Sequence, residues 1–423
     1  MSARRFTGFP GADLSGSEII KYDRMRKPAM RIGMIMDTSF PPDIRVENEA
    51  ITLMDRGFEV FLYHIDYDTR PAREEYRGIR ISRKRGGWLL YKLSALVYTV
   101  PFFRWTVGGS IRKFIRENRI DILHVHDMVI AGAAFRANRP FCLPVILDLH
   151  ENRPEIMEMY KHVNSLPGRW LIRTDRWRRR QRELMKAADH VILVTEEARR
   201  VSEADGIPLS RTTAVPNVVR AGPDTPDTGC TPTDTAKDTF TLLYIGDTSL
   251  RRGTETALKA VDLLREKIPG IQLRLVGSSS QDDELYRIVR ERRLEGRVHF
   301  EGWQKPELLP GFIEKSDVCL SPLLRNIHHD TTYANKLFQY MAAGKPVVAS
   351  DCTAQAAVVK QEKCGLVHRA GDAGDLADAV LTLYRDRGSR EEMGRNGLAA
   401  VKERWNWETA GSSLVAAYER CLS

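Results

Sequence analysis

Short apolar runs alternate with longer segments of helical spacing along most of this chain. In the first half, apolar runs at residues 32–36, 60–63, 122–125, 145–147 and 191–194 are typical of buried strands. A helix-spaced segment at residues 46–56 lies between the first two runs and ends at Gly57. Because strands alternate with helices, the pattern predicts a parallel sheet with helices on both faces.

The same alternation restarts in the second half. Strand patterns lie at residues 241–245, 273–276, 298–300, 318–320 and 347–349, and helical patterns at 254–267, 284–293, 306–314, 336–343, 373–385 and 390–404. The stretch between the halves, residues 220–239, is rich in Pro, Thr, Asp and Gly and has almost no large apolar side chains. Such a composition cannot bury a core, so this stretch is predicted to be a linker.

These patterns predict an α/β protein of two Rossmann-like, doubly wound domains that face a central cleft. A chain of 423 residues also exceeds what one hydrophobic core usually organises. Ligands of such sheets bind beyond the carboxyl ends of the strands, so the cleft is the expected active site. The predicted parts are an N-terminal arm (1–28), an N-terminal Rossmann-like domain (29–219), the linker (220–239), a C-terminal Rossmann-like domain (240–404) and a C-terminal helix that packs back toward the first domain (405–423).

Composition narrows the class of protein. Hydrophobic residues make up 42% and charged residues 29%, as in globular proteins. The net charge of +9 is uneven, because residues 1–219 hold 37 basic against 27 acidic residues and the remainder 28 against 29. Six scattered cysteines without a metal-binding spacing indicate reduced thiols. No stretch reaches the ~18 apolar residues of a membrane span, so we expect a cytoplasmic protein with an anionic partner or a well-solvated basic half.

Two common nucleotide-binding patterns are absent from the sequence. No Gly-x-Gly-x-x-Gly follows a predicted strand, and there is no Walker-type Gly-x-x-x-x-Gly-Lys-Ser/Thr. Both absences argue against a dehydrogenase or a P-loop enzyme.

The stretch 330–351, DTTYANKLFQYMAAGKPVVASD, is the most informative part of the chain. A polar loop leads into a predicted helix that begins near Asn335, and a helix N-terminus offers free N–H groups to a phosphate. Lys336 in the first turn opposes the helix dipole, which an anion bound nearby explains. The pattern therefore indicates a phosphate site.

Within this stretch, KLFQYMAAGKPVVASD resembles the signature helix of the retaining glycosyltransferases of the GT-B fold, the group 1 family. The resemblance continues through RIGMIMDTSFPPDIRVENEAITLMDRGFEV, DILHVHD, DLHE, LLYIGDTSLRRGTE, LRLVG, VHFEGW, SDVCLSPL and the closing WNWETA. It implies transfer of a sugar from a nucleoside diphosphate, with retention at the anomeric carbon. It implies no cofactor and no essential metal, because two basic side chains stabilise the leaving diphosphate.

The resemblance also assigns donor-side residues, with departures. The family's Glu-x7-Glu motif falls on Thr331, with Asp330 beside it, and on Gln339. Arg252 and Lys336 are the expected diphosphate pair and act in catalysis together with Asp330 and Thr331. Asp247 stands where the family has the first basic residue of its phosphate clamp. Further donor contacts are expected from Gly246, Arg251, Gly277, Trp303, Thr332 and Asn335.

On the acceptor side, the resemblance points to the ends of two strands in the first domain. His124 and His126 alternate to the same face of a strand, and His126 matches the family histidine near the reacting sugar. His150 and Glu151 close the next strand. Asp43 and Arg45, in the loop after the first strand, are expected to touch the acceptor or a phosphate.

Two basic or aromatic segments lie in the first domain. Residues 169–186 hold eight basic residues beside Trp170 and Trp177, and residues 87–103 are apolar and aromatic. Basic clusters beside Trp and Leu favour the surface of an anionic membrane, to which a lipid-linked acceptor would bring the enzyme. Ordinary packing, as a solvated helix or a buried helix pair, is the alternative. No nucleic-acid-binding motif is present, so nucleic acid is not expected as the partner.

The leading interpretation is a retaining glycosyltransferase that moves a hexose or N-acetylhexosamine to a glycan or glycolipid acceptor, at the inner face of the cell membrane. A sugar-nucleotide 2-epimerase of the same fold is an alternative, weakened by the uncharged Gln339. A catalytically silent binding relative is the other alternative, because both acidic motif positions and one clamp position are altered.

Overall fold

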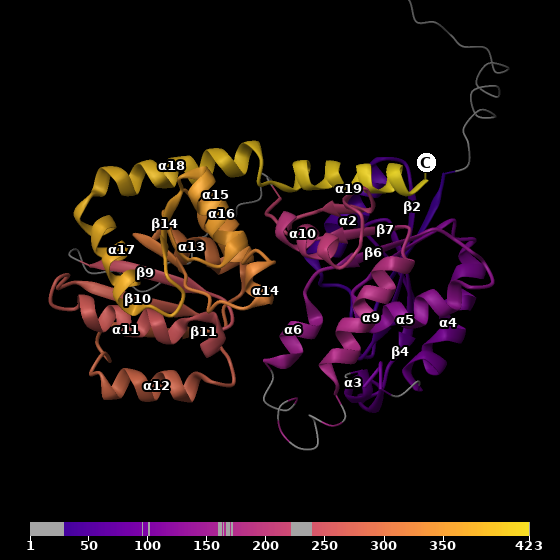
Figure 1. The fold of residues 1–423 in the computed structure, drawn as a ribbon, viewed down its shortest axis with the longest axis horizontal. Coiled ribbons are helices and arrows are strands. Elements are labelled where there is room, and N and C mark those ends of the chain that lie inside the picture. The colour runs from indigo at the N-terminus through magenta and orange to yellow at the C-terminus, as the bar shows by residue number, and fades with distance from the viewer. Residues whose placement is uncertain are drawn as a thin grey trace, which may run out of the picture.

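Two parallel sheets, one in each half of the chain, organise the molecule (Figure 1). The computed structural model describes residues 29–422 except 95, 100, 101, 160–162, 164, 166–169, 171 and 221–238. The predicted arm (1–28) and all of the predicted linker except Arg220 and Thr239 lie outside the described residues. The fold is the expected pair of α/β domains.

The N-terminal sheet has eight strands in the order β3-β4-β2-β1-β5-β6-β7-β8. All neighbours are parallel except β3 and β4. The strands are β1 (Arg31–Met36), β2 (Glu59–Asp66), β3 (Arg73–Tyr76), β4 (Ile79–Arg85), β5 (Ile122–His126), β6 (Val145–Leu149), β7 (His190–Leu193) and β8 (Thr212–Ala214). The five predicted strands of this half are confirmed, whereas β3, β4 and β8 were missed.

The helices of this half pack apolar faces against the sheet. They are α2 (Ile44–Asp55), α3 (Trp88–Ser94), α4 (Phe102–Asn118), α5 (Met128–Asn138), α6 (Arg153–Glu158), α9 (Thr174–Ala187) and α10 (Glu196–Ala204). Trp177, expected beside a membrane-facing basic cluster, is 1% exposed and belongs to the core. Arg178 of the same helix pairs with Glu155 and Glu158. One face of α9 therefore packs in the core, because its spacing turns Trp177, Leu184 and Met185 inward.

The C-terminal sheet has six parallel strands in the order β11-β10-β9-β12-β13-β14. They are β9 (Phe240–Ile245), β10 (Ile271–Val276), β11 (Val298–Gly302), β12 (Val318–Ser321), β13 (Val347–Ser350) and β14 (Gly365–His368). The helices are α11 (Thr254–Leu264), α12 (Asp282–Glu291), α13 (Leu309–Glu314), α14 (Ile327–Asp330), α15 (Asn335–Ala342), α16 (Thr353–Glu362), α17 (Ala373–Arg385) and α18 (Arg387–Glu403). The five predicted strands of this half are confirmed, and β14 was missed.

The last helix, α19 (Trp407–Leu422), leaves the C-terminal domain and lies along the N-terminal one (Figure 1). Trp407 is 2% exposed, and its indole N–H donates to Thr52 of α2 over 2.8 Å. The hydroxyl of Tyr418 lies 2.8 Å from Nδ1 of His124 on β5. The described part of the chain contains no helix that is both long and apolar enough to cross a membrane.

Candidate active site

Glycines shape the loops that follow β9 and β10. Gly246 and Gly277 both have positive φ, at 119° and 138°. A Cβ on Gly277 would lie 2.0 Å from the carbonyl oxygen of Gly246, so no larger residue fits between the two loops. The two loops therefore pack directly against each other at the ends of β9 and β10, and the predicted contact of Gly246 and Gly277 with the donor stays a prediction.

Arg252 lies immediately before α11. Gly253 follows it with a φ of 77°, and a Cβ there would lie 1.7 Å from the carbonyl oxygen of Pro322. This glycine lets a short 3-10 turn (Leu250–Arg252) lead directly into α11. Arg252 is thus held at the N-terminal end of a helix, where anions are favoured.

Lys336 is the most unusual cation of the C-terminal domain. It is 9% exposed, and its ammonium lies 3.5 Å from the centre of the Tyr244 ring. No hydrogen-bond partner for Nζ is found among the described residues. Burial, followed by the nearby charge of Arg252, holds the pKa of Lys336 well below its usual range. An anion bound beside Lys336 and Arg252 would reverse both effects.

Asp247 explains how the two neighbouring arginines differ. Its carboxylate accepts a hydrogen bond from Arg251 over 2.7 Å, whereas Nε of Arg252 lies 3.7 Å away and makes no hydrogen bond within the described chain. Asp247, which stands where the family has a basic phosphate-binding residue, thus neutralises Arg251. Arg252 stays available to a ligand.

The positions of the acidic motif are engaged by the protein itself. Asp330 accepts from the backbone and hydroxyl of Thr353 and pairs with Arg325. The hydroxyl of Thr331 donates to the Ile327 carbonyl, and its own carbonyl accepts from Thr195 of the N-terminal domain. Both side chains are therefore engaged in this structure, and a contact with a donor sugar would form beside these hydrogen bonds or replace them.

The remaining donor-side candidates differ in exposure. Asn335 is exposed at the start of α15, Gln339 is partly exposed one turn later, and the hydroxyl of Thr332 donates to the His328 carbonyl. Trp303 is 71% exposed, so it does not pack in the core. The predicted contact of Trp303 with the nucleotide base stays a prediction.

Two histidines of this region were missed by the sequence analysis. His328 and His329 are 4% and 0% exposed, and burial, followed by charged or histidine neighbours, lowers the pKa of His328 to about 3. Arg252 contributes to the lowered pKa of both histidines. They are neutral side chains beside the cations, and the only signal in the sequence was their place in the loop before α15.

In the N-terminal domain, β5 and β6 bring three histidines together. The rings of His124 and His126 stack with centroids 4.3 Å apart, which confirms that they share one face. His126 is 1% exposed and lies 3.2 Å from His150. Only His150 reaches the surface, with 17% of its side chain exposed. The predicted contact of His126 with a sugar would therefore pass through His150 in this state.

Arg45 does not reach outward as predicted. It is 4% exposed, makes a bidentate contact with Asp148 and donates to the Val215 carbonyl over 2.9 Å. Asp43 accepts from the Val46 amide and so caps α2. The prediction that these two residues contact the acceptor is wrong for Arg45, because the first turn of α2 directs its side chain into the interior.

His150 is the partly exposed member of the three histidines, and its imidazole is charged. Burial alone lowers the pKa of His150, but the carboxylates of Asp127 and Asp148 outweigh it and raise the pKa to about 10. Asp37, which the sequence analysis missed, closes β1 nearby, and burial followed by Asp127 raises its pKa to about 7. Glu151 is exposed and pairs with Arg153 over 3.5 Å. The acceptor side thus combines a charged imidazole with carboxyls of different proton affinity.

A pocket joins the two domains. Leu149, Glu151 and Asn152 line it from the N-terminal side, and Thr331 and Thr332 line it from the C-terminal side. It places the loop after β6 against the motif region, as expected for a cleft between two sheets.

Comparisons with known proteins agree with this arrangement. Residues 44–221 match the family model described as Glycosyltransferase Family 4, and residues 239–386 match the one described as Glycosyl transferases group 1. Together the two segments span well over half of the chain. The chain is 26% identical to the phosphatidyl-myo-inositol mannosyltransferase of Mycobacterium leprae (strain TN), over 92% of this chain and 96% of that one.

Solved structures show the same fold. The sucrose-phosphate synthase of Thermosynechococcus elongatus superposes with a TM-score of 0.73 at 20% identity, covering 93% of this chain and 99% of that one. Anabaena Alr3699/HepE in complex with UDP-glucose superposes with a TM-score of 0.64 at 16% identity, covering 92% and 99%. The chain therefore belongs to the group 1 glycosyltransferases and has the GT-B fold.

Proposed function

We propose that this chain transfers a hexose or N-acetylhexosamine from a nucleoside diphosphate sugar, with retention at the anomeric carbon, to a lipid-linked saccharide in surface-glycan synthesis. The buried, unpartnered ammonium of Lys336 beside Arg252 carries the proposal. A buried cation without a partner is costly, and a diphosphate is the ligand that a group 1 glycosyltransferase brings to this position. The structural likeness to an enzyme crystallised with UDP-glucose supports the same ligand class.

In this proposal Arg252 and Lys336 stabilise the negative charge that develops on the leaving diphosphate, so this step requires no metal ion. The leaving phosphate takes the proton of the acceptor hydroxyl on the face that it departs from, which gives retention. His150, oriented by Asp148 over 3.0 Å, lies on the acceptor side of the cleft. The anomeric configuration of the product, read by NMR, tests retention.

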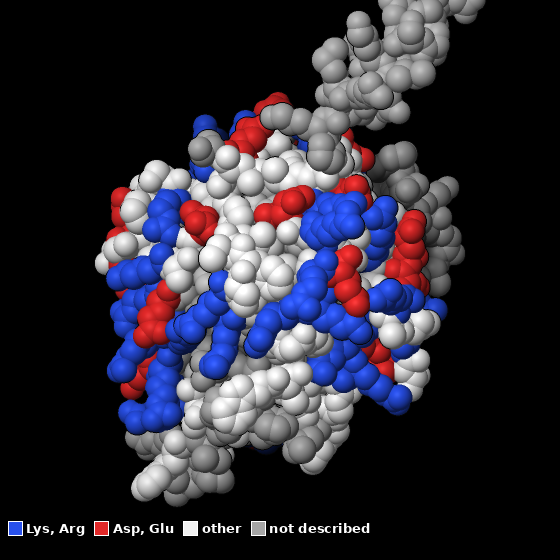
Figure 2. Space-filling model, turned by 90° about the vertical axis from the view of Figure 1, so that its right-hand side faces the viewer, with Lys and Arg blue, Asp and Glu red and all other residues white. Residues whose placement is uncertain are grey.

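Helices α3 and α4 support docking to a membrane that holds the acceptor. Trp88, Tyr91 and Trp105 are 70%, 62% and 67% exposed, and α4 also exposes Arg112, Lys113 and Arg116. Figure 2 shows Lys and Arg spread across this side of the N-terminal domain, with few charged residues at the lower end, where Figure 1 labels α3. Exposed aromatic residues beside basic ones favour an anionic bilayer surface, at the cytoplasmic face in this proposal.

The donor experiment measures the melting temperature of the full chain with UDP-glucose, UDP-N-acetylglucosamine or GDP-mannose. A ligand that binds only the folded state raises stability by about 2.7 kcal/mol at a hundred times its Kd. We expect one donor to raise the melting temperature of the wild type but not of Lys336→Met. An undiminished shift in Lys336→Met would refute the diphosphate assignment.

The transfer experiment then supplies that donor, radiolabelled, together with membrane lipid extract. Label in the lipid fraction supports the proposal. Interconversion of the sugar nucleotide would establish the epimerase instead, and binding without turnover would establish a silent relative. For docking, we expect sedimentation with vesicles that contain anionic lipid and none with neutral vesicles. Trp88→Ser should weaken it about tenfold, and Trp303→Ser, equally exposed on the other domain, should not.

A further inference from the structure

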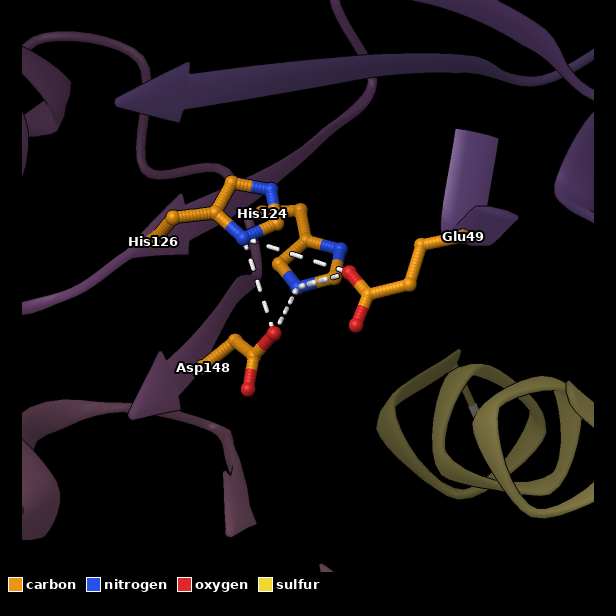
Figure 3. Close-up of side chains that lie close together, drawn as sticks. All are labelled: Glu49, His124, His126 and Asp148. Atoms are coloured by element: carbon orange, nitrogen blue, oxygen red, sulfur yellow. Dashed lines mark ion pairs between the residues drawn. The ribbon is translucent and has the colours of Figure 1, made fainter. Parts of the chain in front are cut away.

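Four side chains converge on one point inside the N-terminal domain, away from the predicted diphosphate site. Glu49 comes from α2, His124 and His126 from β5, and Asp148 from β6, and all four are at most 1% exposed. One ligand atom of each lies within 4.8 Å of the others. Figure 3 shows the two imidazoles turned toward the two carboxylates.

The separations are close to those around a small metal ion. His124 Nε2 lies 3.8 Å from Glu49 Oε2 and 3.6 Å from Asp148 Oδ2. His126 Nδ1 lies 3.9 Å and 3.5 Å from the same two oxygens. With metal–ligand bonds of about 2.0–2.2 Å, tetrahedral ligand atoms lie roughly 3.3–3.6 Å apart. The four histidine–carboxylate separations are within a few tenths of an ångström of that range, and the other pairs, which lie within 4.8 Å, would close by up to about 1 Å.

The same cluster holds polar atoms that the protein leaves unsatisfied. Both oxygens of Glu49 and Nε2 of His124 lack a hydrogen-bond partner among the described residues. Glu49 Oε1 lies 3.0 Å from Arg45 Nε without forming a hydrogen bond, and Oε2 faces the imidazoles. Buried polar atoms are nearly always paired, so Oε2 of Glu49 and Nε2 of His124, unlike the ion-paired Oε1, point to a partner at the centre.

Neighbouring residues already orient two of the four ligands. Arg45 donates to both oxygens of Asp148 and so fixes this carboxylate. The Tyr418 hydroxyl lies 2.8 Å from His124 Nδ1 and leaves Nε2 directed at the centre. In metal sites of proteins, hydrogen bonds from neighbouring residues to the metal ligands hold those ligands in orientation, as Arg45 and Tyr418 do here.

The charges around the cluster also accommodate a cation. Three carboxylates, those of Asp148, Glu49 and Asp43, act on Arg45. Asp127 adds a fourth negative group beside His150. Arg45 and His150 are the basic partners of these four carboxylates, so acidic side chains outnumber basic ones and leave room for a cation.

We propose that Glu49, His124, His126 and Asp148 bind a first-row divalent transition metal, zinc in the first place, as a structural centre beneath the acceptor loops. Mixed imidazole and carboxylate ligands suit this class of ion. The ion would tie α2, β5 and β6 together and, through Tyr418, hold α19 against them. The proposal does not involve the donor site, but it shares His126 and Asp148 with the acceptor side, where both contact His150.

The test treats the full-length protein with a chelator, adds one equivalent of Zn²⁺ or Co²⁺, desalts it and measures the metal per chain. We expect close to one ion, a rise in melting temperature, and for Co²⁺ the visible absorption bands of a four-coordinate site. Glu49→Gln and His126→Asn should each retain at least tenfold less metal. His190→Asn, a buried histidine of β7 outside the cluster, is the matched control and should bind normally.

Each other outcome overturns the proposal. A wild type that retains no ion after desalting shows that Arg45 alone holds the carboxylates together. Equal retention in Glu49→Gln and His126→Asn places the ion elsewhere. If neither variant folds, the wild type with Co²⁺ decides, because a sample without the absorption bands of nitrogen and oxygen ligands has no such site.

Discussion

The two domains treat buried charge in opposite ways. In the N-terminal domain, Arg45 is enclosed by carboxylates that raise its pKa. In the C-terminal domain, Lys336 is equally enclosed but faces Arg252, and its pKa is lowered. The first cation has carboxylate partners within the protein, whereas the second has a cationic neighbour and is proposed to bind an anion. The opposite pKa shifts of the two cations follow from these different neighbours.

The largest expected effect is on the matched side. Arg45→Met leaves the buried carboxylates of Asp148 and Glu49 without their cation, so we expect the free energy of unfolding to fall by about 3–5 kcal/mol. Urea denaturation of chelator-treated protein measures it. Arg287→Met, which removes an exposed arginine of α12, should leave the midpoint unchanged. If Arg45→Met shifts the urea midpoint as little as Arg287→Met does, Arg45 does not stabilise the fold and the contrast between the two domains is wrong.

Lys336→Met tests the unmatched side. We expect kcat/KM to fall about 100–1000-fold, since the variant loses a cation at the leaving group. The melting temperature should stay the same or rise, because a buried ammonium without a partner is removed. The control is Lys360→Met on the exposed end of α16. A loss of stability in Lys336→Met would show that Lys336 stabilises the fold as Arg45 does, and the proposed difference between the two cations would be wrong.

The sequence predicted features of the C-terminal domain more fully than the buried contacts of the N-terminal domain. The order of strands and helices followed from apolar runs, and the prediction of a phosphate site rested on a lysine early in a helix. Both are local patterns. By contrast, β3 and β4 were missed because their polar, alternating residues belong to the edge of the sheet. The partners of Arg45 lie up to 170 residues away in sequence, and no local pattern reports such a contact.

A smaller effect separates the two arginines of the donor loop. Arg251 is held by Asp247 over 2.7 Å, whereas Arg252 makes no hydrogen bond from Nε within the described chain. We therefore expect Arg252→Ala to lower kcat/KM about tenfold more than Arg251→Ala, since Arg251 is hydrogen-bonded to Asp247 whereas Arg252 only lies within 3.7 Å of it. Steady-state kinetics with the donor found by melting checks this. Equal losses would mean that Asp247 releases Arg251 when the donor binds.

The smallest effect lies where the last helix meets the histidine cluster. Tyr418→Phe removes a hydroxyl 2.8 Å from His124 Nδ1 and leaves the ring packing intact. Loss of one buried hydrogen bond should cost about 1 kcal/mol of unfolding free energy, measured in urea. Tyr384→Phe, on a partly exposed ring of α17, is the control and should cost nothing measurable. Because the tyrosine belongs to α19 and the histidine to β5, a cost well above that value would show that this contact holds the C-terminal helix on the N-terminal domain. No cost would show that packing of Trp407 and its neighbours holds it without the hydrogen bond.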